Sequence, residues 1–200
     1  MDWRPQARKI EGELMRNKYE ILGDITIIFL QRGMTTQIDT TDLPRAREFP
    51  NQWRATKRSD SKGWYAQSSI PIEGKRRSTM LHRWLTNAPA GTQVDHFDHD
   101  GLNNRRTSNL RVGTQSQNQQ NRKEAISKTK LRGVYQKGSK FKVEITVDSK
   151  RFYFGVYVDP EYAAMVAAEA RRRLMPFTQE QGSQNDNLWN EISRRYLKSA

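Results

Sequence analysis

A two-residue alternation of apolar and polar side chains constrains the C-terminal half of the chain more than any other feature. The alternation runs through Lys140–Val147 and again through Arg151–Val156, with Asp148-Ser149 between the two runs. Because successive side chains of a strand point to opposite faces, this period predicts two antiparallel strands with one buried face. Arg132–Gln136 is the predicted third strand, joined through a glycine-containing turn.

A helix is predicted directly after these strands. Asp159-Pro160-Glu161 combines a capping residue, a proline in the first turn and an acid near the positive end of the helix dipole. Apolar residues then recur at helical spacing, at Ala163, Val166, Ala167, Ala170 and Leu174. We expect this helix to pack across the apolar face of the sheet, and a shorter helix to follow at Leu188–Leu197.

The N-terminal part is predicted to be rich in strands. Four short runs have the composition of strands: Ile25–Leu30, Thr35–Asp39, Trp53–Thr56 and Trp64–Ser68. The stretch "TTDLPRAREF" predicts a short helix capped by Thr or Asp. Within residues 1–22, Ile10, Leu14 and Tyr19 are spaced to line one face of another helix.

The charge balance narrows the class of partner. Lys and Arg outnumber Asp and Glu by 35 to 22, a net charge of +13. The excess is concentrated in residues 101–150, which hold twelve basic and three acidic side chains. This pattern favours a polyanion such as nucleic acid over a merely solvated lysine-rich surface.

The absence of cysteine excludes disulfides and cysteine-based zinc sites and fits a reducing compartment. No apolar run approaches the roughly 20 residues that a membrane span needs. Residues 1–10 contain no apolar signal core. We therefore expect a cytoplasmic protein with no secretion signal and no membrane partner.

The stretch "VDHFDHDGLNNRRTSNLR" gathers three Asp and two His into six residues and then continues into arginines. Carboxylates this close repel one another unless a cation lies among them, and hard cations such as Mg²⁺ prefer oxygen ligands. A neutral imidazole with a pKa of about 6.5 suits a general base. A polar helix is predicted to begin at Thr114, where Thr114 and Gln117 have capping-box spacing.

This stretch resembles the HNH endonucleases, particularly the homing type of phages and introns. The resemblance rests on Asp95-His96, on Asn109 thirteen residues after His96, and on Asn118 nine residues further. The flanking text "LHRWL", "PAG", "GLNNRR" and the Gln-rich run around Asn118 is similar too. The resemblance implies a ββα-metal unit: two short strands, a loop and a helix around one divalent ion.

The resemblance also implies roles for individual residues. Asp95 and Asn118 would bind the metal, most suitably Mg²⁺ with Mn²⁺ as the alternative, and His96 would be the general base. Asn109 would tie down the loop through hydrogen bonds to the backbone. The candidate phosphate contacts are Arg83, Arg105, Arg106 and Arg111, of which one or two are expected to orient the loop instead, with His82 as a supporting or phosphate-facing residue.

Several alternatives stay open at this point. Asn121 competes with Asn118 as the amide ligand on the predicted helix. Asp98, His99 and Asp100 depart from the commonest form of the motif, so we expect them at the loop surface, with membership of the metal site as the alternative for Asp98 or His99. A zinc site at His96-x-x-His99 would lack a clear third and fourth ligand.

Leu131–Leu174 resembles the AP2 domain, a three-stranded sheet with one helix that binds DNA. "RGV", the glycine at Gly155 and the Ala-rich helix carry the resemblance, while Tyr135 and Phe141 replace the usual tryptophans. A sheet laid in the major groove presents a row of side chains to bases and phosphates. The expected contacts are Arg132, Tyr135, Lys142, Glu144, Thr146, Arg151 and Tyr153; the alternative is a sheet face that is only solvated.

Together these features predict an α+β chain with four parts: a β-rich region with flanking helices at 1–79, an HNH core at 80–126, an AP2-like domain at 127–178 and a helical tail at 179–200. The predicted function is metal-dependent cleavage of double-stranded DNA, without a small-molecule cofactor, by an enzyme from a phage or a bacterial host. The first alternative is a non-catalytic DNA-binding regulator that retains both folds, and the second is an RNA-binding protein.

Overall fold

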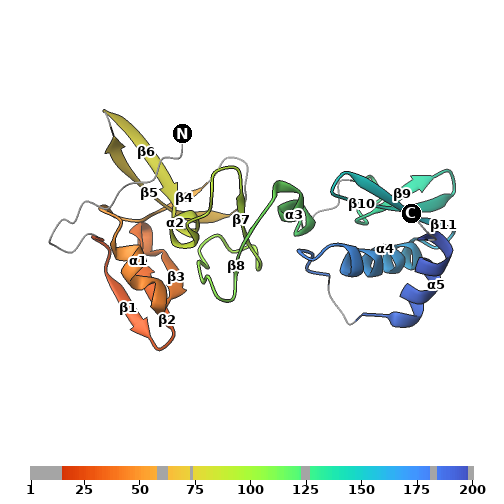
Figure 1. The fold of residues 1–200 in the computed structure, drawn as a ribbon, viewed down its shortest axis with the longest axis horizontal. Helices are drawn as coiled ribbons and strands as arrows, with labels where there is room; N and C mark the ends of the chain where they lie inside the picture. The colour runs from red at the N-terminus through yellow and green to blue at the C-terminus, as the bar shows by residue number, and fades with distance from the viewer. Residues whose placement is uncertain (1–14, 58–62, 73, 123–126, 181–183, 198–200) are drawn as a thin grey trace. The chain divides into compact units, whose positions relative to one another are not determined.

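The computed structural model describes residues 15–57, 63–72, 74–122, 127–180 and 184–197. The chain is α+β, with several small antiparallel sheets and few helices. It divides into two compact units, Met1–Thr114 and Gln115–Ala200, whose elements are drawn in Figure 1. Each unit is considered separately below.

The first sheet of the N-terminal unit has the order β1-β2-β3, with β1 at Tyr19–Leu22, β2 at Ile25–Phe29 and β3 at Thr35–Asp39. Its antiparallel register buries Ile28 and Ile38 completely. The prediction of a short helix lined by Ile10, Leu14 and Tyr19 is wrong at Tyr19, where β1 begins; Ile10 and Leu14 lie outside the described residues.

The second sheet has the order β4-β5-β6, with β4 at Arg54–Lys57, β5 at Trp64–Ile72 and β6 at Lys75–Met80. The sequence predicts β4 and the first half of β5. It does not predict β6, because "KRRSTM" lacks the apolar alternation that marks a half-buried strand. Strand β6 forms because it pairs with β5 over six residue pairs, from Gln67–Met80 to Ile72–Lys75.

Aromatic residues join these two sheets to two short helices, α1 (Leu43–Arg47) and α2 (Leu81–Thr86). Phe49 and Trp53 are fully buried, with ring centroids 4.6 Å apart, and Phe49 lies edge-on to Trp84 at 5.1 Å. Helix α1 follows a 3-10 turn at Thr40–Asp42, as the sequence predicts for this region. The predicted cap is not formed, because the Asp42 side chain makes no capping bond and binds an arginine instead.

A two-stranded ribbon completes the N-terminal unit. Strands β7 (Gln93–His96) and β8 (Leu110–Gly113) are antiparallel, with Asp95 opposite Arg111 and His96 opposite Leu110. The loop between them returns to β3, where Gln37 and Asn103 form a parallel bridge. The β7–β8 loop is therefore attached to the first sheet rather than standing alone.

The second unit begins with α3 (Gln115–Gln120) and contains a sheet of order β11-β10-β9. The strands are β9 (Val134–Lys137), β10 (Lys140–Val147) and β11 (Lys150–Tyr157). Strands β10 and β11 lie where the two-residue alternation predicts them, and β9 begins two residues after the predicted start at Arg132. Residues Asp148 and Ser149 turn the chain with φ of 47° and 66°. A bulge between Lys142 and Glu144 interrupts the β10–β11 register.

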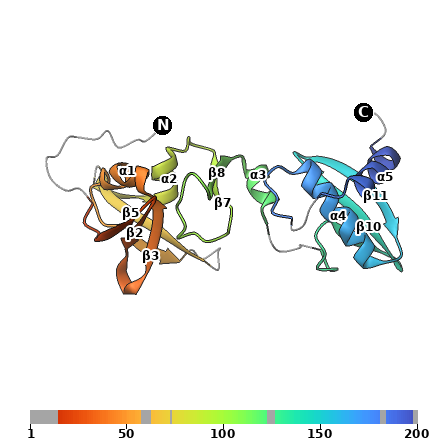
Figure 2. The same cartoon turned by 90° about the horizontal axis from the view of Figure 1, so that it is seen from below.

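Helix α4 (Pro160–Leu174) packs on this sheet, as Figure 2 shows, and α5 (Asp186–Tyr196) packs against α4 and β11. Asp159 caps α4 by accepting a hydrogen bond from the Glu161 amide at 2.9 Å. The shared core holds the apolar face of both helices and of the sheet, including Val143, Phe154, Val166 and Ile192.

Gly101 in the β7–β8 loop gives the first testable prediction. A Cβ at this position would lie 2.4 Å from the Trp64 carbonyl oxygen and 2.6 Å from the Tyr65 ring. We expect Gly101→Ala to lower the free energy of unfolding by about 1–3 kcal/mol, because β5 has to move to admit the methyl group. Gly63→Ala is the matched control, since nothing lies within 4 Å of its Cβ position. Equal urea midpoints for the two variants would contradict this packing.

Candidate functional site

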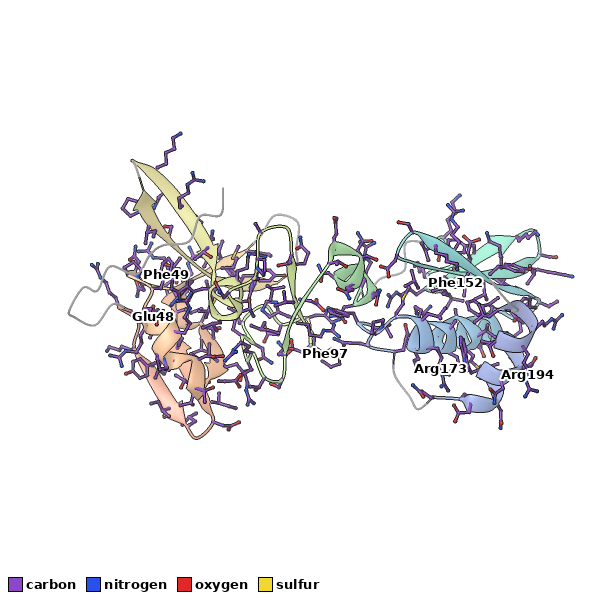
Figure 3. All side chains as sticks on the ribbon, in the orientation of Figure 1. Glu48, Phe49, Phe97, Phe152, Arg173 and Arg194 are labelled. Atoms are coloured by element: carbon purple, nitrogen blue, oxygen red, sulfur yellow. The ribbon has the colours of Figure 1, made fainter. Side chains whose placement is uncertain are left out.

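Asp95 and His96 occupy the end of β7, and both are buried. Asp95 accepts a hydrogen bond from Nη2 of Arg111, its cross-strand partner, at 2.5 Å. The Arg111 guanidinium also lies 4.7 Å from the ring centroid of Phe97, the exposed residue after His96 that Figure 3 labels. The strand thus brings a carboxylate and an imidazole into consecutive positions, with the carboxylate already paired with a cation.

Aromatic rings enclose His96. The His82 ring lies perpendicular to the His96 ring with centroids 4.9 Å apart, and Tyr65 is 5.8 Å from His96. Burial lowers the pKa of His96 below its usual value, and the hydrogen bond to Asn104 and the nearby carboxylates offset only part of this effect. His96 is therefore neutral at pH 7, the state that a general base requires.

Asn104 fixes the orientation of the His96 imidazole. Its Oδ1 lies 3.3 Å from His96 Nε2, while its Nδ2 donates to Thr36 Oγ1 at 2.8 Å. The Thr36 hydroxyl uses its own proton to donate to the Leu102 carbonyl. It can therefore only accept from Asn104 Nδ2, which leaves Asn104 Oδ1 facing the His96 imidazole. Nε2 then carries the proton and Nδ1 carries the lone pair.

Asn104 is the functional residue that the sequence reasoning missed. It is completely buried, although it lies in a polar loop and is the second residue of an Asn-Asn pair. The sequence marks Asn104 only as part of an Asn-Asn pair next to the motif. Once buried, its amide needs several hydrogen-bond partners. Nothing in the sequence favours one asparagine of the pair over the other.

The rest of the loop is held by its own polar side chains. Asn109 accepts from the Asp98 amide at 2.9 Å and donates to the Asn103 carbonyl at 2.6 Å. Asp98 accepts from the Asp100 amide at 2.8 Å and from Asn103 Nδ2 at 2.6 Å. Asp100 accepts from the Leu102 amide at 2.9 Å. Asp98 and Asp100 therefore shape the loop between His96 and Asn109.

The end of the loop is bound to carboxylates of the first sheet. Asp39 accepts from Arg105 Nε at 2.9 Å, from the Thr107 amide at 2.8 Å and from the Thr107 hydroxyl at 2.9 Å. Burial alone would raise the pKa of Asp39, but these hydrogen bonds outweigh it and the net pKa is lowered. Arg106 binds both oxygens of Asp42 in a bidentate pair.

All four arginines predicted as phosphate contacts have protein partners. Arg83 donates to the carbonyl oxygens of Ala88, Pro89 and Thr92 and so holds the turn before β7. Arg105, Arg106 and Arg111 bind carboxylates, and only the Arg106 side chain is half exposed, at 51%. Contact of these arginines with phosphate stays a prediction, and all four stabilise the fold through the partners named above.

The donor set for a metal is small. Within the part of the chain that the structure describes, no group of three or more His, Asp or Glu side chains is arranged to hold an ion, so a zinc site built on His96 and His99 finds no support. Asp95 supplies one carboxylate of the kind that hard divalent ions prefer, and Arg111 already binds it. The residues fit an ion only if substrate, water or further ligands complete its coordination.

Asn118 lies on α3 and belongs to the second unit, whereas Asp95 and His96 belong to the first. Helix α3 is attached to its own unit: Ser116 donates to Asp148 at 2.8 Å, and Arg132 donates to the Gln120 carbonyl at 2.6 Å. The role of Asn118 as a ligand, and the alternative at Asn121, stay predictions.

Six of the seven residues predicted to contact DNA from the second unit share one sheet face. The register pairs Lys142 with Tyr135, Glu144 with Tyr153 and Thr146 with Arg151. These residues, Tyr135, Lys142, Glu144, Thr146, Arg151 and Tyr153, form what we call the β9–β11 face.

The seventh residue, Arg132, is not on a strand of the sheet but borders the β9–β11 face, and its contact with DNA stays a prediction. Arg132 precedes β9 and lines a cleft of about 470 Å³ beside α3, which Tyr135 and Thr146 of the β9–β11 face also line. There its guanidinium donates a hydrogen bond to the Gln120 carbonyl, and its Nη1 lies 3.6 Å from Oε1 of Glu180. Burial, together with repulsion from Arg171, lowers the pKa of Arg132.

Comparison with known families supports the motif. A family model described as HNH endonuclease matches residues 87–120. This span contains Asp95, His96, Asn109 and Asn118, and it points to nuclease activity with DNA as the substrate. No curated protein and no solved structure matches the chain. Over the described residues, no helix has the length and apolar character needed to cross a membrane.

The lowered pKa of Asp39 gives the second prediction. A carboxylate with a lowered folded-state pKa stabilises the fold above its unfolded pKa of about 3.9, and this stabilisation disappears as pH falls through the folded value. We expect Asp39→Asn to reduce the free energy of unfolding by about 2 kcal/mol at pH 7, and the difference from the native protein to vanish in acid.

Asp24→Asn is the control for this experiment. Its side chain is 81% exposed and contacts Arg105 alone among the hydrogen bonds described, so its effect at pH 7 stays within about 0.5 kcal/mol. Urea titrations between pH 2 and pH 7 measure both variants. A pH-independent difference between native protein and Asp39→Asn would contradict the account.

Proposed function

We propose that this protein is a metal-dependent HNH endonuclease that hydrolyses phosphodiester bonds of double-stranded DNA, of the site-preferring kind found in phages and introns. One observation carries the proposal: a buried, neutral His96 lies beside Asp95 inside the segment that matches the HNH family model. The basic balance of the chain is consistent with a polyanionic substrate.

His96 is the proposed general base. With Nε2 held by Asn104, the lone pair on Nδ1 accepts the proton of the attacking water. The enclosing Tyr65 and His82 rings keep bulk water away from the imidazole and restrict its rotation. A base of this kind supplies roughly 10²–10⁴-fold of the rate.

Asp95 and Asn118 are the proposed ligands of a divalent ion, for which Mg²⁺ is the first candidate and Mn²⁺ the second. A bound ion would relieve charge on the phosphate and assist departure of the 3′ oxygen. Since Asp95 is paired with Arg111, an arriving ion has to share or replace that guanidinium. We therefore expect weak metal binding until DNA contributes its own oxygen ligands.

The second unit is the proposed source of site preference. Its three-stranded sheet and helix α4 have the elements of an AP2-like module, and the β9–β11 face offers Lys142, Arg151 and two exposed tyrosines. Whether DNA is nicked or cut on both strands depends on how many active sites meet one duplex.

A non-catalytic DNA-binding regulator is the second candidate. The observation that favours it is the Asp95–Arg111 ion pair together with the small donor set around it. A regulator binds DNA without cutting it, so the two candidates separate in a cleavage experiment.

Replacing the proposed base gives the third prediction. With Mg²⁺ or Mn²⁺ at low salt, the native protein converts supercoiled plasmid to nicked or linear forms. His96→Ala slows this by roughly 10²–10⁴-fold, and Asp95→Ala also abolishes most activity, while both variants still shift DNA in a gel. His99→Asn is the control and is expected to cut at the native rate. Asparagine tolerates the left-handed φ of 66° at this position, so the loop keeps its conformation.

Intact plasmid after incubation with the native protein, together with normal DNA binding, supports the regulator instead. Equal cutting rates for native protein and His96→Ala reject His96 as the base.

Asn104 gives the fourth prediction, as a positioning residue. We expect Asn104→Ala to lower the single-turnover cleavage rate by about 10²-fold, because the imidazole loses its fixed orientation, while the affinity for DNA in EDTA stays native. Thermal unfolding of the same preparation checks that the buried site remains folded. A loss of DNA affinity in parallel with the rate would assign Asn104 to the fold alone.

A further inference from the structure

The β5–β6 hairpin extends beyond its sheet. Strand β4 pairs with β5 only from Trp64 to Gln67, whereas β6 pairs with β5 as far as Ile72. From Ser68 outward the sheet therefore consists of two strands, and Figure 1 shows this ribbon projecting from the rest of the N-terminal unit. We call the segment formed by residues 68–72 and 75–79 the β5–β6 ribbon.

The ribbon and its sheet are exclusively cationic among the described residues. Strands β4, β5 and β6 carry five positive side chains, namely Arg54, Lys57, Lys75, Arg76 and Arg77. Within the described residues of 49–94 there is no Asp or Glu; the acids of this part of the sequence, Asp60 and Glu73, lie outside them. Like charges gathered on one projecting element favour an anionic partner.

Both faces of the ribbon carry cations. Residues directly opposite in an antiparallel pair share a face, so Arg76 and Ser78 lie on the face of Ser69, and Arg77 lies on the face of Ile70. Lys75, Arg76 and Arg77 are all exposed. The Arg76 Nε donates to Ser69 Oγ at 3.1 Å, beside a shallow hollow of about 140 Å³ lined by polar side chains.

This geometry matches one feature of duplex DNA. The major groove of B-form DNA is about 12 Å wide, admits a two-stranded ribbon, and has a row of phosphates along each wall. A ribbon with cations on only one face would suit a flat contact, whereas cations on both faces suit a groove with two anionic walls. The minor groove, about 6 Å wide, is too narrow for two strands.

We propose that the β5–β6 ribbon enters the major groove of the DNA, with Lys75 and Arg77 on one face and Arg76 on the other contacting the phosphates of the two walls. The inference rests on the proposed function in taking duplex DNA as the partner, and it adds a contact surface in the N-terminal unit. A-form RNA is the poorer partner, because its major groove is deep and narrow.

Salt-dependent binding in EDTA tests the ribbon without requiring cleavage. We expect Lys75→Gln/Arg77→Gln to bind a duplex at least about tenfold more weakly at low salt. Its log–log salt slope should be shallower by about 1.8, because each phosphate that a cation neutralises contributes about 0.9 to the slope. The matched control is Arg194→Gln/Arg195→Gln, which removes two exposed charges from α5 and keeps the native slope. Arg76→Gln is measured as an independent single variant.

Protection of guanine N7 from dimethyl sulphate reports on the major groove. The native complex is expected to protect guanines in one short tract, and Lys75→Gln/Arg77→Gln and Arg76→Gln to lose that protection while the control retains it. A native slope and native protection in both ribbon variants overturn the inference, and so does stronger binding of double-stranded RNA than of DNA in direct competition.

The outcome is separable from that of the proposed function. Cleavage by the native protein with unaffected binding by the ribbon variants removes the ribbon and leaves the nuclease. Absence of cleavage, with weakened binding by the ribbon variants, removes the nuclease and leaves a DNA-binding ribbon.

Discussion

The carboxylate of Asp39 at the end of β3 is the constraint on which the candidate site depends. It binds Arg105 and Thr107, at the far end of the loop that begins after His96. The neighbouring Asp42 holds Arg106, and the bridge between Gln37 and Asn103 fixes the middle of the loop. With its far end and its middle attached to the first sheet, the loop presents Asn104 to His96 in one orientation. The basic loop is thus held both by buried acids of the first sheet and by its own polar side chains.

The parts of this fold that were predictable are those with a local signal. Strands β10 and β11 alternate with period two, and Asp159 with Pro160 marks the start of α4; each needs only a few neighbouring residues. Strand β6 lacked such a signal, because pairing with β5 makes it a strand. The pairs Arg105–Asp39 and Arg106–Asp42 join residues more than 60 positions apart, and a single sequence contains no trace of such pairing. For the same reason the sequence does not reveal the contacts of Arg132 with Gln120 and Glu180 in the cleft beside α3.

Burial has two opposing consequences in the candidate site. Burial keeps His96 uncharged, and burial of polar groups is costly unless each finds a partner. The network from Leu102 through Thr36 and Asn104 to His96 supplies those partners and also selects the tautomer. The same network links a strand of the first sheet to the imidazole, so the fold of the N-terminal unit and the proposed chemistry rest on the same hydrogen bonds. The two surfaces proposed to contact DNA, the β5–β6 ribbon and the β9–β11 face, lie outside this network.

The central claim is that water, activated at His96, attacks a DNA phosphorus atom and expels the 3′ oxygen. Cleavage of a duplex in ¹⁸O-labelled water, with mass spectrometry of the new ends, measures this step directly. The account predicts one ¹⁸O atom in each new 5′-phosphate and an unlabelled 3′-hydroxyl on the other fragment. Ends that carry a 3′-phosphate, or 5′-phosphates without the label, would contradict it.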